Sequence, residues 1–427
     1  MAVANESAAA PGAERRSDFR PASLDALNFL LADVRGALGP FLNVFLVTQQ
    51  HWSQSAVGLV TMIGGWLGLA AQTPVGAAID ATRAKRGLIV AGLIVLAAGA
   101  TTIYLAPNFW PVLIAYSLTA MVGDVFGPAV AALTLGLYRR AELARRMGRN
   151  AALDHAGNVA IAAVAGAIGW AVSQRAVFLL VPVFAVLAAV AVLSIPARAI
   201  DHQRARGVEP SATENDGAAS PSGISVLVKC RPLLVYACCA MLFHFANAPL
   251  LPLVGQKLAL THGDLATAMM SACIIAAQAI MLPIALLVGH NADRWGRKPI
   301  LLIGFAILPV RAALYTLFDD TTWLIGVQLL DGVGAGIFGA ITPLLLADLM
   351  HGTGRYNIAQ GAVATAQGLG ASSSGLIAGL IIDHLGYTAA FVEAAAVAAI
   401  ALAVLATLMP ETASMAGRSK TGGDKPY

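Results

Sequence analysis

Long apolar runs alternate with short polar breaks over most of the 427-residue sequence. Each run holds about 20 residues, the length that an α-helix needs to cross the hydrocarbon layer of a bilayer. One longer break, rich in Ser, Pro, Gly and charged residues, divides the runs into two sets. We therefore expect transmembrane helices near residues 26–48, 56–79, 88–106, 111–137, 150–172 and 177–195, and then near 231–254, 265–289, 299–318, 323–348, 358–383 and 388–410.

These runs predict an all-α polytopic membrane protein with twelve transmembrane helices in two six-helix bundles. The bundles would comprise residues 26–195 and 231–410. Residues 196–230 are too polar and turn-rich to bury a core, which predicts a linker. We expect residues 1–25 and 411–427 to be tails, and the first tail lacks the apolar core of a cleaved signal peptide.

Composition and charge support this interpretation. Hydrophobic residues make up 58% of the chain and charged residues 12%, against roughly 25% charged in a soluble domain. Of the 27 Lys and Arg, 23 lie in the tails and breaks on one side, whereas Arg175 and Lys257 lie on the other side and Arg35 and Arg311 within runs. By the positive-inside rule, both termini are cytoplasmic in a multi-pass protein of the plasma (inner) membrane. This location explains the net charge of +4 without a nucleic-acid partner. The four cysteines predict neither a disulfide framework nor a metal site.

A short basic turn between the eighth and ninth runs contains the most specific motif, which reads Gly289-x-x-x-Asp293-Arg294-x-Gly296-Arg297-Lys298. Its two glycines would let backbones pass closely where a side chain would clash. Its basic side chains would hold the turn on the cytoplasmic side, and its aspartate can accept hydrogen bonds from them. A weaker copy between the second and third runs keeps Gly76, Asp80 and Arg83, but has Ala81 where the motif has arginine.

This pair of motifs resembles the signature loops of the major facilitator superfamily, which recur once in each half. The resemblance covers residues 26 to 410. It implies two bundles that rock about a central site, with the loops at Asp80 and Asp293 latching the cytoplasmic side. It also implies that the first, fourth, seventh and tenth spans line a cavity, and that the protein works as a monomer.

Ionisable residues within the apolar runs are candidates for function, because a charge at membrane depth is expensive. At a rise of 1.5 Å per residue, Asp33 of the first run and Asp124 of the fourth each lie about 10 Å from the cytoplasmic side. The resemblance makes these carboxylates and Arg35 neighbours. They could bind substrate or carry protons, since a buried carboxylate can take up a proton near neutral pH. The alternative is a structural ion pair.

The second half repeats this pattern. Arg311 and Asp331 both lie roughly 18 Å from the cytoplasmic side and predict a pair, with a structural role favoured for Arg311. His244 lies near 20 Å on the same count and is a candidate ligand or proton carrier, or alternatively a helix-packing hydrogen-bonding group. The candidate coupling or cavity residues are Asp33, Arg35, Asn43, Asp124, His244, Asn247 and Asp331.

No hydrolase, kinase or dinucleotide motif is placed credibly, so we expect no enzymatic activity and no cofactor. The sequence predicts a secondary active transporter whose partners are a small-molecule substrate, protons and the lipid bilayer. Proton-coupled export of drugs or metabolites is the favoured function. A proton-coupled importer of a small organic anion is the alternative, because Arg35 or Arg311 could pair with a carboxylate. A membrane sensor that transports nothing is a third hypothesis.

Overall fold

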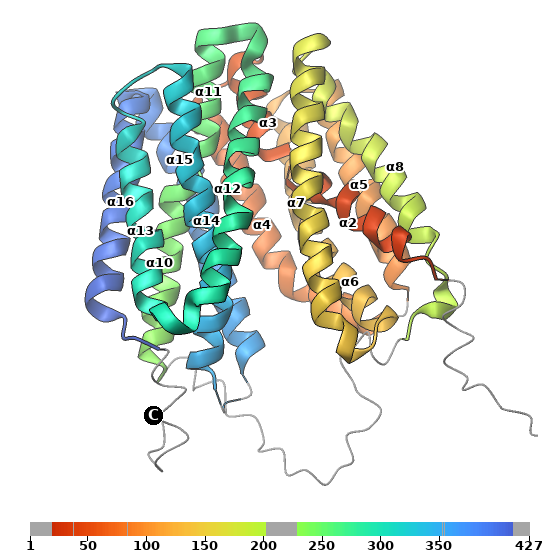
Figure 1. The fold of residues 1–427 in the computed structure, drawn as a ribbon. Helices are drawn as coiled ribbons and strands as arrows, with labels where there is room; N and C mark the ends of the chain where they lie inside the picture. Colours follow the sequence, from red (N-terminus) through yellow and green to blue (C-terminus); the bar gives the residue numbers. More distant parts are fainter. Residues whose placement is uncertain are drawn as a thin grey trace, which may run out of the picture.

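The computed structural model describes residues 19–36, 38–82, 84–201, 229–351, 353 and 355–412, apart from the side chains of residues 33–36, 38, 73, 76–81, 124, 140, 141, 144, 262 and 264. Within this part of the chain, every regular element is a helix, and the long helices run side by side between two ends of a bundle (Figure 1). The first half consists of α2 (Pro21–Gly36), α3 (Leu38–Thr48), α4 (Gln54–Ala81), α5 (Lys85–Leu105), α6 (Phe109–Leu137), α7 (Arg140–Ala171), η1 (Arg175–Leu179), α8 (Leu180–Leu193) and η2 (Ala197–Ala199). The second half consists of α10 (Arg231–Asn247), α11 (Leu250–His262), η4 (Gly263–Leu265), α12 (Ala266–Trp295), α13 (Arg297–Leu314), α14 (Thr321–Leu349), α15 (Tyr356–Leu385) and α16 (Tyr387–Leu408).

Ten helical segments in the described part are long and apolar enough to cross a bilayer. A helix suits such sequences because it satisfies its own backbone hydrogen bonds where no water is present. Their outer faces stay apolar, as Trp170, Val186 and Leu286 illustrate with 62 to 66% exposure. This pattern is that of a protein with lipid around it.

Two of the twelve expected spans are not among these ten segments. The expected first span is divided into α2 and α3, with residue 37 outside the described residues. The expected ninth span corresponds to α13, an 18-residue helix with Arg297 and Lys298 at its start and Arg311 near its end. The count of twelve spans therefore stays a prediction.

The two ends of the bundle differ in charge. We call the end with Arg139, Gly296 and Arg355 the basic end, and the end with Asn108 and Gly386 the opposite end. The basic end is the lower end in Figure 1. Because each long helix crosses from one end to the other, the position of a residue along its helix gives its depth in the bundle.

Two large apolar cores divide the molecule along the sequence. One is built from buried residues between Leu24 and Ile200, and the other from buried residues between Leu233 and Met409. A smaller cluster joins the halves, with Phe41 and Val44 from α3 against Ala259 of α11 and Met270 of α12. The linker between the halves lies mostly outside the described residues.

Contacts between the halves pair α3 with α11, α4 with α15, and α7 with α12. The backbones approach very closely between α4 and α15, where a Cβ on Gly58 would lie 2.3 Å from the Gly375 carbonyl oxygen. Small residues permit this approach, which supplies packing in the absence of a hydrophobic drive between membrane helices. Since Gly58 lies in the second turn of α4, this contact is near the opposite end.

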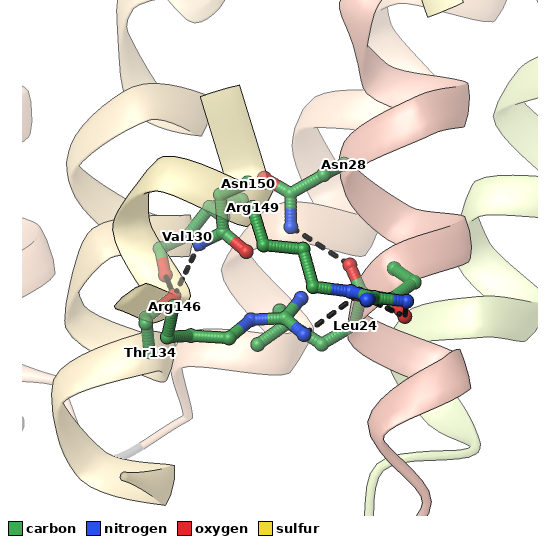
Figure 2. Close-up of polar contacts among 8 residues, drawn as sticks. Leu24, Asn28, Val130, Thr134, Arg146, Arg149 and Asn150 are labelled. Atoms are coloured by element: carbon green, nitrogen blue, oxygen red, sulfur yellow. Dashed lines mark hydrogen bonds and ion pairs between the residues drawn. The ribbon is translucent and has the colours of Figure 1, made fainter. Parts of the chain in front are cut away.

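A polar cluster at the basic end ties α2 to α7 (Figure 2). The Asp25 carboxylate pairs with Arg146 at 2.7 Å and with Arg149 at 2.8 Å, while Asn150 donates to the Thr134 hydroxyl of α6 at 3.0 Å. Partial burial opposes ionisation of Asp25, but hydrogen bonds from the two arginines outweigh it and lower its pKa below 3.8. The Arg146 side chain is only 4% exposed, so its charge is balanced mainly by Asp25.

Candidate functional site

A buried polar network joins α13 and α14 in the second half. The Arg311 side chain is 1% exposed and pairs with Asp331 at 2.5 Å. Its other nitrogens donate to the Tyr315 hydroxyl at 3.3 Å and to Gln328 Oε1 at 3.1 Å. Gln328 Nε2 in turn donates to Asp331 at 3.1 Å, so one amide contacts both members of the ion pair. The sequence prediction that Arg311 and Asp331 form a pair is confirmed.

Helix geometry explains how these side chains meet. Gln328 and Asp331 are three residues apart on α14 and therefore share a face. Arg311 lies on the buried face of α13, in register with Gly304 and Leu308. Tyr315 directly follows the last residue of α13 and donates to Gln328 at 2.5 Å. Gln328 and Tyr315 were not predicted from the sequence, although their spacing from Asp331 and Arg311 could have indicated them.

Asn247 and His244 extend this network from α10. Asn247 is the last residue of α10, and its Oδ1 accepts from Arg311 at 2.7 Å. His244 Nδ1 lies 2.9 Å from the Ala240 carbonyl oxygen, which can only accept, so Nδ1 carries the proton of this bond. In the neutral ring Nε2 is then an acceptor. The His244 ring also contacts Phe338 of α14, with the ring centres 4.9 Å apart.

Two cavities meet at this network. The first, of about 210 Å³, lies within the second half and is lined by His244, Asn247, Arg311, Asp331 and Phe338 among others. The second, of about 330 Å³, lies between the halves and is also lined by Asn247, Arg311 and Asp331. The ion pair therefore faces both the interior of one half and the space between the two halves.

Uncharged polar side chains also line the cavity between the halves, among glycine, proline and aliphatic residues. They are amides and hydroxyls from both halves, namely Asn43, Gln54, Thr61 and Tyr116 from the first and Gln256 and Ser374 from the second. Asn43 Oδ1 is buried and has no hydrogen-bond partner in the structure, so it can accept a bond from a molecule in the cavity. Of these six residues, only Asn43 was predicted from the sequence.

Four of the seven predicted cavity residues can be placed in the structure. Asn43, His244, Asn247 and Asp331 line the two cavities. Asp33 and Arg35 belong to α2 and Asp124 to α6, but their side chains lie outside the described residues. Their proximity and their roles stay predictions.

The basic turn between the eighth and ninth runs is shorter than expected. α12 continues to Trp295 and α13 begins at Arg297, so Gly289, Asp293 and Arg294 are helical and Gly296 alone connects the two helices. Gly296 has φ +83°, a conformation that favours glycine. The expectation of a close approach at Gly289 is wrong, because a Cβ there would meet no atom within 4 Å. The apolar run ends near Gly289, but polar residues at a membrane surface continue the helix.

Carboxylates hold this turn from three elements. Arg297 pairs with Asp293 at 2.7 Å and with Asp348 of α14 at 3.1 Å. Burial would lower the pKa of Arg297, but these two carboxylates keep it above its usual value. Glu411, which follows α16, accepts from the backbone N–H groups of Arg297 and Lys298 at 2.9 and 3.0 Å. Neither Glu411 nor Asp348 was predicted from the sequence. Of the weaker copy of this motif, Arg83 and the side chains of Gly76 and Asp80 lie outside the described residues.

Comparisons with known proteins agree with this architecture. The family model of the Major Facilitator Superfamily matches residues 24–290 and 233–426. Two uncharacterized MFS-type transporters of Mycobacterium tuberculosis, from strains CDC 1551 / Oshkosh and ATCC 25618 / H37Rv, are each 46% identical over 390 residues, which is 91% of this chain and 93% of each relative.

Among solved structures, the nucleoside transporter NupG superposes with a TM-score of 0.73, and a single-residue mutant of it with 0.76. The superposition covers 91% of this chain and 98 or 99% of those chains, at 12% sequence identity. At this low identity, the superposition shows only that the fold is shared. The family model and the two relatives match this chain in amino-acid sequence as well. From these comparisons, the chain belongs to the Major Facilitator Superfamily and is a multi-pass membrane transporter.

Proposed function

We propose that this transporter exports a neutral or weakly polar small molecule in exchange for protons, by alternating access of the cavity between the halves. The observation that carries the proposal is the Arg311–Asp331 pair. It supplies the only formal charges among the described residues that line the two cavities, and the two charges neutralise each other. Apart from this pair, a ligand therefore meets uncharged amides and hydroxyls together with aliphatic side chains and aromatic rings.

We propose that the Asp331 carboxylate takes up and releases the exchanged proton. Its side chain is 19% exposed, whereas that of Arg311 is 1% exposed, so water reaches the carboxylate more easily. Protonation of Asp331 would leave the guanidinium charge buried with only uncharged partners, namely Asn247, Gln328 and Tyr315. Because a buried uncompensated charge is unfavourable, protonation would favour another arrangement of the two halves.

The same contacts argue against an anionic substrate bound by Arg311. Its guanidinium already donates to four side chains, one of which is a carboxylate. An incoming anion would have to displace Asp331. The anion importer, the alternative hypothesis, therefore depends on Arg35 as its cation.

Several features of the wider function belong to the same proposal. We infer two bundles, residues 26–195 and 231–410, in a monomer in the inner membrane with both termini in the cytoplasm. The excess of Lys and Arg at the basic end supports this orientation. The basic segments around Asp80, at the end of α4, and around Asp293, at the end of α12, would then close the cytoplasmic side. The contacts of Arg297 with Asp293 and Asp348 fix the second of these segments within its own half.

The proposal can be tested with purified protein in liposomes that carry an imposed pH gradient. Uptake of a panel of neutral lipophilic drugs, nucleosides and small organic anions would be measured with and without a proton ionophore. Nucleosides enter the panel because the nucleoside transporter NupG has the same fold. We expect a neutral compound to accumulate against its gradient only while the pH gradient lasts.

Two variants make the test specific. Asp331→Asn removes the proposed proton site, and Asp319→Asn is its control because Asp319 is a 75% exposed aspartate paired with Lys257 of the same half. We expect Asp331→Asn to abolish gradient-driven accumulation and the control to retain it. Accumulation of only anions, or an unchanged response in Asp331→Asn, would contradict the proposal.

A further inference from the structure

The first turn of α4 is capped by a side chain from the other half of the protein. The Asp383 carboxylate, near the end of α15, accepts from the backbone N–H groups of Gln54 and Ser55 at 3.0 and 2.8 Å. These N–H groups begin α4 and have no carbonyl partner inside the helix. A carboxylate suits them because the N-terminus of a helix is the positive end of its dipole.

A second bridge lies beside this cap. Gln54 Nε2 donates to the Tyr387 hydroxyl at 2.8 Å, and that hydroxyl donates to Gln256 Oε1 at 3.4 Å. Gln54 belongs to α4 of the first half, whereas Tyr387 begins α16 and Gln256 lies on α11. One hydroxyl therefore connects elements of both halves.

These contacts lie at the wall of the cavity between the halves, where the backbones of α4 and α15 touch directly. Gln54 and Gln256 both line the cavity between the halves. A Cβ on Gly379 of α15 would lie 2.4 Å from the Gln54 carbonyl oxygen, so no side chain lies between the α4 and α15 backbones here. The bonds of Asp383 and Tyr387 therefore form where the cavity ends toward the opposite end of the bundle.

We propose that Asp383 and Tyr387 form a clasp that holds the two halves together at the opposite end, and that a ligand in the cavity loosens it. A molecule that hydrogen-bonds to Gln54 or Gln256 competes with the Tyr387 hydroxyl for the same amides. Loss of that bond leaves the exposed Asp383 cap as the remaining polar contact of the clasp. Both Asp383 and the freed N–H groups can then be hydrated, so the clasp can open without burying an unpaired group.

This inference concerns how the halves separate, and it holds whatever the substrate or its direction. It is tested by the distance between spin labels on the two halves, placed at Asn108→Cys and Leu317→Cys in a background in which the four native cysteines are replaced. Asn108 and Leu317 are exposed at the opposite end, in different halves, and neither touches the clasp. The measurement uses the full chain in lipid nanodiscs without any ligand.

We expect Asp383→Asn and Tyr387→Phe each to raise the ratio of separated to joined halves about tenfold, since each weakens a bond that exists only when the halves meet. The double variant should raise it further. Asp319→Asn is the control, because its pair with Lys257 lies at the same end but within one half. Distance distributions of both single variants and the double variant that match the control would overturn the proposal. Because no transport is measured, this result is independent of the pH-gradient assay.

Discussion

Arg311 of α13 and Asp331 of α14 form an ion pair of 2.5 Å in which the two partners differ in access to water. The guanidinium is enclosed by Tyr315, Gln328 and Asn247, whereas the carboxylate is the more exposed partner. The proposed proton exchange would therefore take place on Asp331, while Arg311 would keep its charge. In the proposed function, the pair converts the uptake of a proton into a rearrangement of the two halves.

The first prediction concerns the stability of this pair. Asp331→Asn leaves the Arg311 charge uncompensated, and we expect a loss of about 3 kcal/mol. The double variant Arg311→Gln/Asp331→Asn removes both charges and should be more stable than Asp331→Asn alone. Thermal unfolding in detergent, followed by tryptophan fluorescence, gives the comparison. A double variant that is less stable than Asp331→Asn would show that Arg311 does not depend on the carboxylate.

The second prediction separates the two glycines of the basic turn. Gly296→Ala places a side chain at φ +83° and close to Glu411, so we expect a loss of about 1 to 2 kcal/mol. Gly289→Ala is its matched control, since it lies in a helix with free space and should be neutral or stabilising by up to about 1 kcal/mol. Thermal unfolding of both variants checks this. Equal effects of the two substitutions on stability would mean that the folded protein does not require the backbone conformation of a glycine at position 296.

The third prediction concerns Glu411, which caps the start of α13. Glu411→Ala removes the acceptor of two backbone N–H groups at the start of α13. We expect a loss of about 1 to 2 kcal/mol, the range for a helix N-cap. Glu411→Gln keeps an acceptor oxygen and should lose less. Thermal unfolding of both variants gives the comparison. A Glu411→Ala variant as stable as wild type would exclude Glu411 as a cap.

The fourth prediction follows from the pKa of Asp25. Its folded-state pKa is below 3.8, so ionised Asp25 stabilises the folded protein above that pH. This contribution is lost as the pH falls through the folded-state value. Asp25→Asn should therefore be less stable than wild type at pH 7, and the difference should shrink below about pH 4. Urea unfolding at pH 7, 5 and 3 checks the trend, and a difference that does not change with pH would contradict it.

The sequence by itself determined the class of the molecule. Apolar runs of about 20 residues have one stable solution in a bilayer, the helix, because backbone groups there cannot bond to water. The basic motif at Asp293 and its weaker copy at Asp80 were sufficient to indicate the family that the comparisons show. Depth along a helix also paired Arg311 with Asp331, because the rise per residue is fixed.

Only the tertiary structure decided the lateral partners. Helical rise gives the depth of Gln54 or Gln256, but not which helix lies beside it, since that depends on packing between residues more than 100 positions apart. The same limit hid Glu411 at the turn and Asp383 at the first turn of α4. The end of α12 at Trp295 also needed the structure, because a helix continues past its apolar run wherever side chains and water satisfy its last carbonyls.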